Sequence, residues 1–97
     1  MPMKILDFIP AEGYILVEPL DRTSGDYLQV YTEEFPQLAR VLKIGPPTYN
    51  PYTDRVIYPA CKAGDVILHS AGGFETLKFE GKEYRIVRFD KILAIKA

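Results

Sequence analysis

The sequence is poor in the residues that mark several classes of protein. Its 97 residues include one cysteine, Cys61, and one histidine, His69. A lone cysteine cannot form an internal disulfide, which excludes a disulfide-stabilised secreted scaffold. A structural zinc site needs several Cys or His ligands, so the sequence predicts no metal site.

Long apolar runs are absent as well. The longest apolar stretches, such as residues 92–95, are far shorter than the roughly 18 residues that a membrane-spanning helix needs. Residues 1–4, Met-Pro-Met-Lys, lack the apolar region of a signal peptide. We therefore expect a cytoplasmic protein.

The chain also has no large excess of charge of one sign. Twelve Lys and Arg side chains stand against 13 Asp and Glu side chains, which gives a formal net charge of −1. This near-balance argues against a protein that mainly coats nucleic acid, because such proteins are normally basic. A length of 97 residues, with 47% hydrophobic and 26% charged residues, predicts a single folded domain over residues 1–97.

What the sequence does contain is a series of short β-forming runs between turns. Eight prolines and seven glycines leave few windows that are long enough for a stable helix. Gly81 and Lys82 separate two alternating runs and indicate a hairpin turn. This pattern predicts an all-β fold, a small barrel or sandwich. The expected strands are residues 14–17, 40–44, 65–69, 78–80, 83–89 and 92–95.

Two segments interrupt this rhythm. Residues 21–38 have polar ends, an apolar middle and four acidic side chains against one basic one. They form either an edge strand at residues 27–32 or a long loop with an apolar centre, and loops of this length are usually functional or disordered. Residues 45–59 contain four prolines and three tyrosines. Because proline is excluded from central strands, they form either a projecting hairpin or a packed loop.

No combination of side chains assembles a recognisable active site. Cys61 and His69 are the residue types of a thiolate nucleophile and its base, but a half-buried thiol and a surface histidine are the simpler interpretation. Glu33 and Glu34 are neighbours that we expect to face solvent. The Gly-Gly pair at 72–73 lacks the Lys and Ser of a phosphate loop and fits a turn before a strand at 74. The sequence therefore predicts a protein that is not an enzyme and needs no cofactor.

A nucleic-acid-binding module is the main alternative function. Small β-barrels bind nucleic-acid strands through basic and aromatic side chains. Residues 82–97 have five basic side chains against two acidic ones, with Tyr84 and Phe89 between them. A solvated strand face with several lysines has the same composition.

Taken in order, the motifs of the chain resemble those of the GroES-type co-chaperonin family. Residues 62–68, Lys-Ala-Gly-Asp-Val-Ile-Leu, are similar to the family's Lys-x-Gly-Asp-x-Val strand entry. Residues 73–75 and 81–84 match its Gly-x-Glu and Gly-x-Glu-Tyr positions. Residues 90–95, Asp-Lys-Ile-Leu-Ala-Ile, resemble its Asp-Ile-Leu-Ala-Ile ending, and residues 39–45 resemble its small-x-Val-x-x-Val-Gly strand.

The resemblance implies a small irregular antiparallel β-barrel that works as a co-chaperonin. Such a protein forms a heptameric ring that caps a nucleotide-bound GroEL-type chaperonin and encloses a client protein. The family's mobile loop, which binds the chaperonin, corresponds to residues 21–38. Its roof hairpin, which closes the top of the dome, corresponds to residues 46–58. The family's terminal strands pair between neighbouring subunits, although both termini can instead complete the barrel of their own subunit.

The candidate site residues follow from the same resemblance. In the loop, Gly25 permits a turn, and the apolar anchor is either Tyr27 with Leu28 or the run Leu28, Gln29 and Val30. Pairing of the chain termini would place residues 3–6 of one subunit beside the end of the next. The expected subunit interface consists of Ile5, Leu6, Leu93, Ala94 and Ile95.

The roof and the loop also depart from the family pattern. Tyr49 and Tyr52 either stack around the ring axis or pack back on Pro46 and Pro51. The loop is shorter than is typical and lacks the family's Gly-Gly pair, and residues 13–14, Gly-Tyr, stand where the family has Asp-Arg. These departures suggest a specialised member of the family, such as a phage-encoded one.

Overall fold

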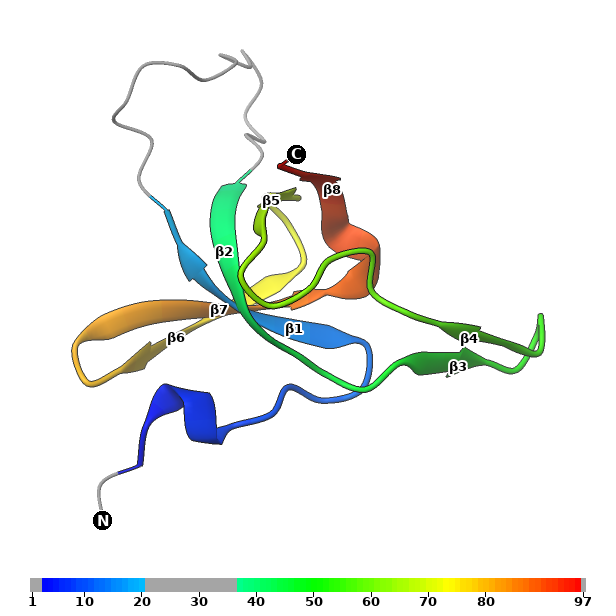
Figure 1. The fold of residues 1–97 in the computed structure, drawn as a ribbon, viewed down its shortest axis with the longest axis horizontal. Coiled ribbons are helices and arrows are strands. Elements are labelled where there is room, and N and C mark those ends of the chain that lie inside the picture. Colours follow the sequence, from blue (N-terminus) through cyan, green and yellow to red (C-terminus); the bar gives the residue numbers. More distant parts are fainter. Residues whose placement is uncertain (1–2, 21–36, 97) are drawn as a thin grey trace.

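Antiparallel strands make up almost all of the regular structure (Figure 1). The computed structural model describes residues 3–20 and 37–96 of the chain. The strands are β1 (Tyr14–Pro19), β2 (Gln37–Ile44), β3 (Thr48–Asn50), β4 (Arg55–Ile57), β5 (Val66–His69), β6 (Phe74–Phe79), β7 (Lys82–Arg88) and β8 (Ile92–Ile95), with 3-10 turns η1 (Ile5–Asp7) and η2 (Phe89–Lys91). Six strands form one sheet in the order β6-β7-β1-β2-β5-β8, and β3 pairs with β4 in a second sheet. Each predicted strand overlaps an observed one, which confirms the all-β fold.

The core lies inside the curve of the six-stranded sheet, where alternate residues of each strand point inward. The residues Ile15, Val17, Val41, Ile67 and Val87 are each at most 1% exposed. All five are β-branched, and such side chains pack well on a pleated surface. The register shifts within the β1–β2 and β5–β8 pairs, and irregularities of this kind bend and twist a sheet.

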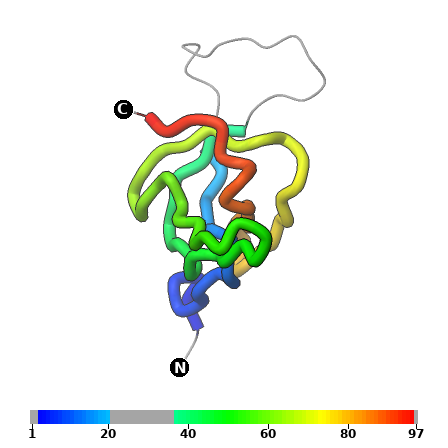
Figure 2. Tube along the Cα trace, turned by 90° about the vertical axis from the view of Figure 1, so that its right-hand side faces the viewer, coloured from blue at the N-terminus to red at the C-terminus, as the bar shows by residue number. Residues whose placement is uncertain are grey.

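The two ends of this sheet approach each other, so that it coils into a small barrel (Figure 2). Three strands separate β5 from β6 in the sheet order. Even so, the rings of His69 in β5 and Phe74 in β6 meet edge to face, with centroids 5.1 Å apart. At the two ends of the sheet, a Cβ atom at Gly73, directly before β6, would lie 3.0 Å from Cε of Lys91, directly before β8. This arrangement is the small β-barrel that the resemblance implies.

The β6–β7 hairpin turns on two residues that both have positive φ. Phe79 pairs with Lys82, and between them Glu80 has φ 52° and Gly81 has φ 81°. Positive φ at both central residues defines a type I′ turn, whose twist matches that of the flanking strands. The predicted turn at Gly81 and Lys82 is therefore one residue too late, because Lys82 already pairs in β7.

Two segments differ from the sequence-based expectation. Residues 3–6, expected as a terminal strand, lead instead into η1. The amide of Lys4 donates to Oδ2 of Asp7 at 2.8 Å, and the amide of Asp7 donates to the carbonyl of Lys4 at 2.9 Å, which closes a single turn. β2 begins at Gln37, which pairs with His69, so the last two residues of the predicted loop belong to a strand.

The β3–β4 hairpin leaves the barrel beside a tight backbone crossing at Gly45. The amide of Gly45 donates to the carbonyl of Tyr14 at 2.9 Å, and the amide of Gly13 donates to the carbonyl of Pro46 at 3.1 Å. A Cβ atom at position 45 would lie 2.3 Å from the carbonyl oxygen of Ala11 and 2.7 Å from that of Tyr14. Only glycine fits here, and it lets the N-terminal segment cross directly against the base of the hairpin.

Candidate functional sites

The ends of β1 and β2 lie together where residues 21–36 leave and rejoin the barrel. The amide of Leu20 donates to the carbonyl of Leu38 at 2.9 Å. Across the same strand pair, Oε1 of Glu18 lies 3.7 Å from Nη1 of Arg40. The predicted loop therefore starts and ends at adjacent points on one end of the barrel. The alternative edge strand at residues 27–32 lies outside the described residues. So do the candidate anchor residues Gly25, Tyr27, Leu28, Gln29 and Val30.

β8 is an edge of the six-stranded sheet. It pairs with β5 on one side, and in the described part of the chain no strand pairs with its other side. Leu93 is 59% exposed, Ile95 is 36% exposed, and Ala94 between them is exposed as well. β8 thus completes the barrel of its own chain and, among the described residues, still presents an unpaired sheet edge.

The N-terminal segment lies against the β6–β7 side of the barrel. The rings of Phe8 and Phe79 meet edge to face with centroids 6.0 Å apart. Leu6 is 47% exposed and Ile9 is 71% exposed, whereas Ile5 is partly buried. This segment therefore presents apolar side chains on the surface.

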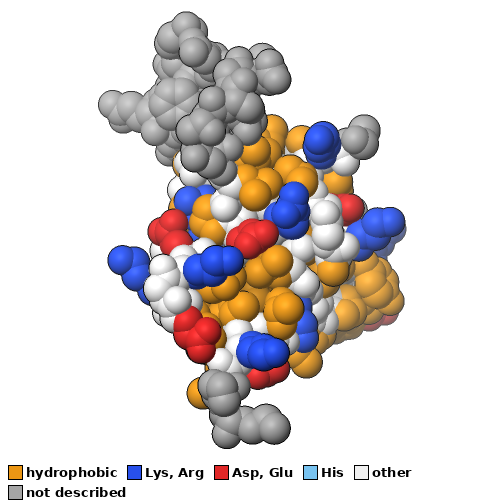
Figure 3. Space-filling model, turned by 60° about the vertical axis from the view of Figure 1, so that its left-hand side comes forward, with side chains coloured by type: hydrophobic (Ala, Val, Ile, Leu, Met, Phe, Trp, Pro, Cys, Tyr) orange, Lys and Arg blue, Asp and Glu red, His pale blue; other side chains and the backbone are white. Residues whose placement is uncertain are grey.

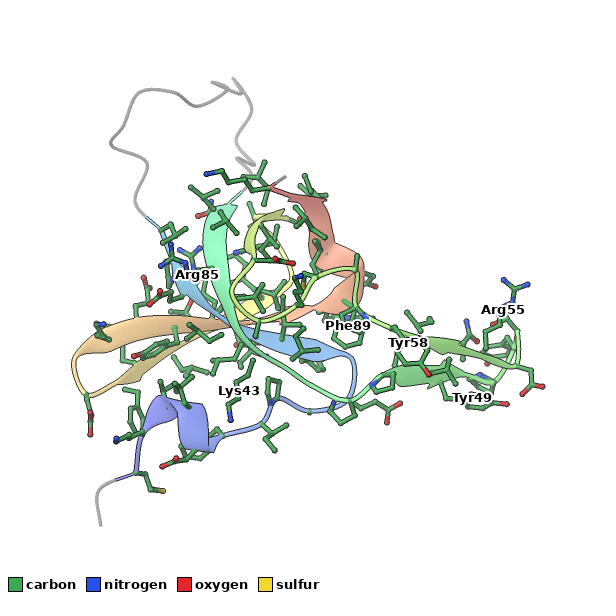
Figure 4. All side chains as sticks on the ribbon, in the orientation of Figure 1. Lys43, Tyr49, Arg55, Tyr58, Arg85 and Phe89 are labelled. Atoms are coloured by element: carbon green, nitrogen blue, oxygen red, sulfur yellow. The ribbon has the colours of Figure 1, made fainter. Side chains whose placement is uncertain are left out.

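The β3–β4 hairpin projects from the barrel and carries exposed aromatic side chains (Figure 4). Tyr52 is 97% exposed, so it does not pack back on Pro46 or Pro51 within the described chain. Tyr49 is half exposed, and its hydroxyl donates to the carboxylate of Asp54 across the turn. This hydrogen bond raises the pKa of Tyr49.

Cys61 and His69 do not have the properties of a reactive pair. Cys61 is buried; burial, together with the charge of Asp65, raises the pKa of its thiol, which disfavours the thiolate. His69 is fully buried, so its expected place on the surface is wrong. Its Nδ1 lies 2.8 Å from the carbonyl oxygen of Ser70, and burial lowers its pKa. Both side chains are suited to packing rather than to catalysis.

The basic stretch at residues 82–97 does not present the aromatic platform that binding of a nucleic-acid strand uses. Tyr84 is only 8% exposed, and Phe89 packs on the core. Arg88 lies 3.3 Å from Asp90. Figure 3 shows basic and acidic side chains interspersed over one face of the molecule. These features weaken the nucleic-acid-binding alternative.

Neither a metal site nor a membrane span emerges from residues 3–20 and 37–96. That part of the chain has no group of His, Cys, Asp and Glu side chains that could hold a metal ion. It also has no helix that is long and apolar enough to cross a membrane.

A cluster of His69, Phe74 and Arg85 was not anticipated from the sequence. The Cζ atom of Arg85 lies 4.9 Å from the centre of the Phe74 ring, whose other neighbour is His69. Nε of Arg85 and Nε2 of His69 are buried without a hydrogen-bond partner among the described residues. The only hint in the sequence is that Arg85 stands two residues before Val87, which places both on the same face of β7.

Comparison with known proteins agrees with this architecture. The family model described as the chaperonin 10 kDa subunit matches residues 7–96. The chain belongs to this family. The co-chaperonin GroES of Cutibacterium acnes is 32% identical over 90 residues, which cover 89% of this chain and 91% of the relative. Those of Streptomyces griseus and Bifidobacterium longum are both 33% identical over 90 residues, which cover 89% of this chain and 86% and 92% of the relatives.

Membership in the chaperonin 10 family confirms the resemblance drawn from the sequence motifs. The family is one of co-chaperonins and not of catalytic enzymes. The match takes in all eight strands, including the β3–β4 hairpin, whereas residues 3–6 precede it. In this chaperonin 10 chain, the fold and the co-chaperonin class are therefore established together.

Proposed function

We propose that this chain is the subunit of a seven-membered ring that caps a GroEL-type chaperonin in its nucleotide-bound state. The ring would enclose a folding client protein beneath it. The observation that carries the proposal is the family match over residues 7–96. A further support is that β1 and β2 bring the ends of residues 21–36 together at one end of the barrel.

In this proposal residues 21–38 bind the chaperonin. Their apolar centre, residues 27–30, enters an apolar groove of the partner, and Gly25 permits the turn before it. Fixing the backbone of a loop costs roughly 1–2 kcal/mol per residue, so one loop binds weakly. Loops presented together by one ring gain avidity, which exceeds single-site affinity by about 10²–10⁴. Weak single contacts also allow the ring to leave when the chaperonin changes shape.

We assign the subunit interface to the two ends of the chain. The free edge of β8 and its exposed Leu93 support this assignment, because an unpaired edge otherwise invites aggregation. Since residues 5–7 form a 3-10 turn, Ile5 and Leu6 would contribute side-chain contacts. Deleting residues 1–7 should yield monomers, and an intact ring after that deletion would remove this segment from the interface. The assigned residues are Ile5, Leu6, Leu93, Ala94 and Ile95.

The β3–β4 hairpin would form the roof of the dome. Tyr49 and Tyr52 are exposed, and Tyr52 makes no packing contact with the prolines beside it in the described chain, which supports contacts around the ring axis. Replacing both tyrosines with Ser tests this role, because axial packing predicts a less stable ring. Unchanged ring stability would count against it.

The decisive test is the solution mass by light scattering, first alone and then with a bacterial GroEL-type chaperonin and nucleotide. We expect the mass of seven chains, and co-elution that requires nucleotide. Leu28→Ser should abolish co-elution and keep the ring, whereas the matched variant Leu28→Met retains the apolar volume and should keep both. A monomer that ignores the chaperonin and is retained on oligonucleotides would favour the nucleic-acid alternative instead.

A further inference from the structure

We propose that Arg85 is a second contact with the chaperonin: a fixed guanidinium at the loop end of the barrel that binds a carboxylate of the partner. This inference rests on the proposed co-chaperonin function. It adds a contact made by the barrel itself to the contact made by the loop.

Arg85 differs from the other two arginines of the six-stranded sheet. Nη1 of Arg40 lies 3.7 Å from Oε1 of Glu18, and Nη2 of Arg88 lies 3.3 Å from Oδ2 of Asp90, so both arginines form ion pairs. Arg85 forms no ion pair with any described residue, and its Nε is buried without a hydrogen-bond partner there. That Nε is inaccessible, whereas the terminal N–H groups of the half-buried Arg85 are the donors that an approaching acceptor can reach.

Packing holds the Arg85 side chain in position. Its Cζ atom lies 4.9 Å from the centre of the Phe74 ring, and Phe74 packs in turn against the fully buried His69. A guanidinium over an aromatic face stays charged and directs its N–H groups outward in its own plane. Because the side chain is already ordered, it loses little conformational freedom when a partner binds.

Arg85 lies at the end of the barrel where residues 21–36 leave and rejoin it. It pairs in register with Val17, close to the end of β1, and its neighbour His69 pairs with Gln37, the first residue of β2. Figure 4 shows Arg85 beside the last part of β1. The end of the barrel that presents the loop therefore presents Arg85 as well.

A carboxylate is the partner group that this arrangement fits. Arginine binds carboxylates and phosphates through paired N–H donors, and such charge-assisted bonds are stronger than neutral ones. The partner proposed for this end of the ring is a protein. The planar anionic groups that a protein offers are the carboxylates of its Asp and Glu side chains. A nucleic-acid phosphate has similar chemistry, and the test below separates the two.

The first experiment compares Arg85→Met with Arg88→Met in binding of the assembled ring to the nucleotide-bound chaperonin. Met keeps an apolar side chain on Phe74, so the barrel and the ring should persist, which circular dichroism and light scattering check. Each ring carries several copies of the site, so a modest loss of affinity at each copy produces a larger loss of affinity for the whole ring. We expect Kd to rise at least about tenfold for Arg85→Met and to stay within about twofold for Arg88→Met, with a shallower salt dependence in the former.

The second experiment identifies the partner group directly. The ring carrying Arg85→Lys is coupled to the chaperonin with a zero-length carbodiimide reagent, which joins a lysine to a carboxylate in contact with it. Peptide mapping should find a chaperonin Asp or Glu joined at position 85. The ring carrying Arg88→Lys is the control, because residues 85 and 88 lie on opposite faces of β7 and position 88 should not couple.

Three outcomes overturn the inference. Unchanged affinity of Arg85→Met, with no coupling at position 85, would show that the barrel makes no such contact although the loop still binds. Loss of oligonucleotide retention in Arg85→Met, with chaperonin affinity unchanged, would assign the site to a phosphate. A wild-type ring that does not bind the chaperonin would remove the proposed function itself, and this inference with it.

Discussion

The β6–β7 hairpin and the β3–β4 hairpin each have a turn residue other than glycine with positive φ, but their surroundings are opposite. In β7, Val87 is fully buried and Tyr84 is 8% exposed, because the hairpin belongs to the six-stranded sheet. In the other hairpin, Val56 is 48% exposed and Tyr52 is 97% exposed. An isolated two-stranded hairpin is at best marginally stable in water. The β3–β4 hairpin therefore depends on its local polar contacts and on its junction with the barrel.

This difference shows how one chain can separate stability from recognition. Each hairpin contains a non-glycine residue with positive φ, Glu80 in one and Asp54 in the other, with φ of 52° and 53°. Glu80 lies at the tip of a hairpin whose strand β7 is paired on both sides within the six-stranded sheet, whereas Asp54 accepts a hydrogen bond from Tyr49. Because polar contacts maintain the β3–β4 hairpin, its aromatic side chains remain exposed and would be available to a neighbouring subunit of the proposed ring.

The largest effect should come from the junction between hairpin and barrel. Gly45→Ala places a Cβ atom against backbone oxygens that cannot move independently, and we expect a loss of about 3 kcal/mol in the free energy of unfolding. Gly72→Ala is the matched control, since nothing lies within 4 Å of its Cβ position, and its effect should stay below about 0.5 kcal/mol. Urea denaturation at one fixed protein concentration measures the free energy of unfolding of both variants. Equal stability of the two variants would show that the crossing at Gly45 does not constrain the fold.

The same substitution in both hairpins tests the comparison directly. Val87→Ala removes two methyl groups from a fully buried site, and we expect a loss of about 2 kcal/mol. Val56→Ala acts on a half-exposed side chain in β4 and should cost less than about 0.5 kcal/mol in the isolated subunit. Thermal and urea unfolding give the two values. A loss at Val56 as large as that at Val87 would mean that the β3–β4 hairpin is buried in solution.

The two turns should differ in how far substitution by glycine stabilises the protein. Glu80→Gly relieves a positive φ and should stabilise the protein by about 0.5–1 kcal/mol. Asp54→Gly relieves the same strain but removes the acceptor of the Tyr49 hydroxyl, so the gain should largely disappear. The absorbance titration of the tyrosines provides a second measurement, because the raised pKa of Tyr49 should return toward 10.0 in Asp54→Gly. An unchanged titration would exclude the Tyr49–Asp54 bond in solution.

The smallest expected effect is a pH dependence of the barrel's stability that comes from the buried His69. Burial holds the pKa of His69 below its usual 6.5, so the unfolded chain takes up a proton more readily than the folded one. The contribution of His69 to stability is complete above about pH 6.5 and is lost as the pH falls toward its folded-state pKa. We expect His69→Phe, which keeps the ring contact with Phe74, to unfold with less pH dependence between pH 7.5 and 5.5 in urea. Identical pH profiles for the two proteins would contradict this.

Much of the barrel could be predicted from the sequence because its signals are local. The alternation in residues 83–89 and the Gly-Pro-Pro run that ends β2 depend only on neighbouring residues. The buried position of His69 could not be predicted, because it results from a ring contact with Phe74 after the sheet has coiled. The 3-10 turn of residues 5–7 was also missed, since a short apolar run by itself does not distinguish a strand from a turn closed by Asp7.

The sequence by itself determined the strands of the six-stranded sheet and the co-chaperonin family, because these depend on residue types at short spacings along the chain. The tertiary structure alone decided which distant residues meet. It brought Arg85 and His69 onto one aromatic ring, placed the N-terminal segment against Gly45, and left Tyr52 exposed. These contacts depend on how far the sheet coils and which edges remain unpaired, and both are settled only when all the strands pack around one core.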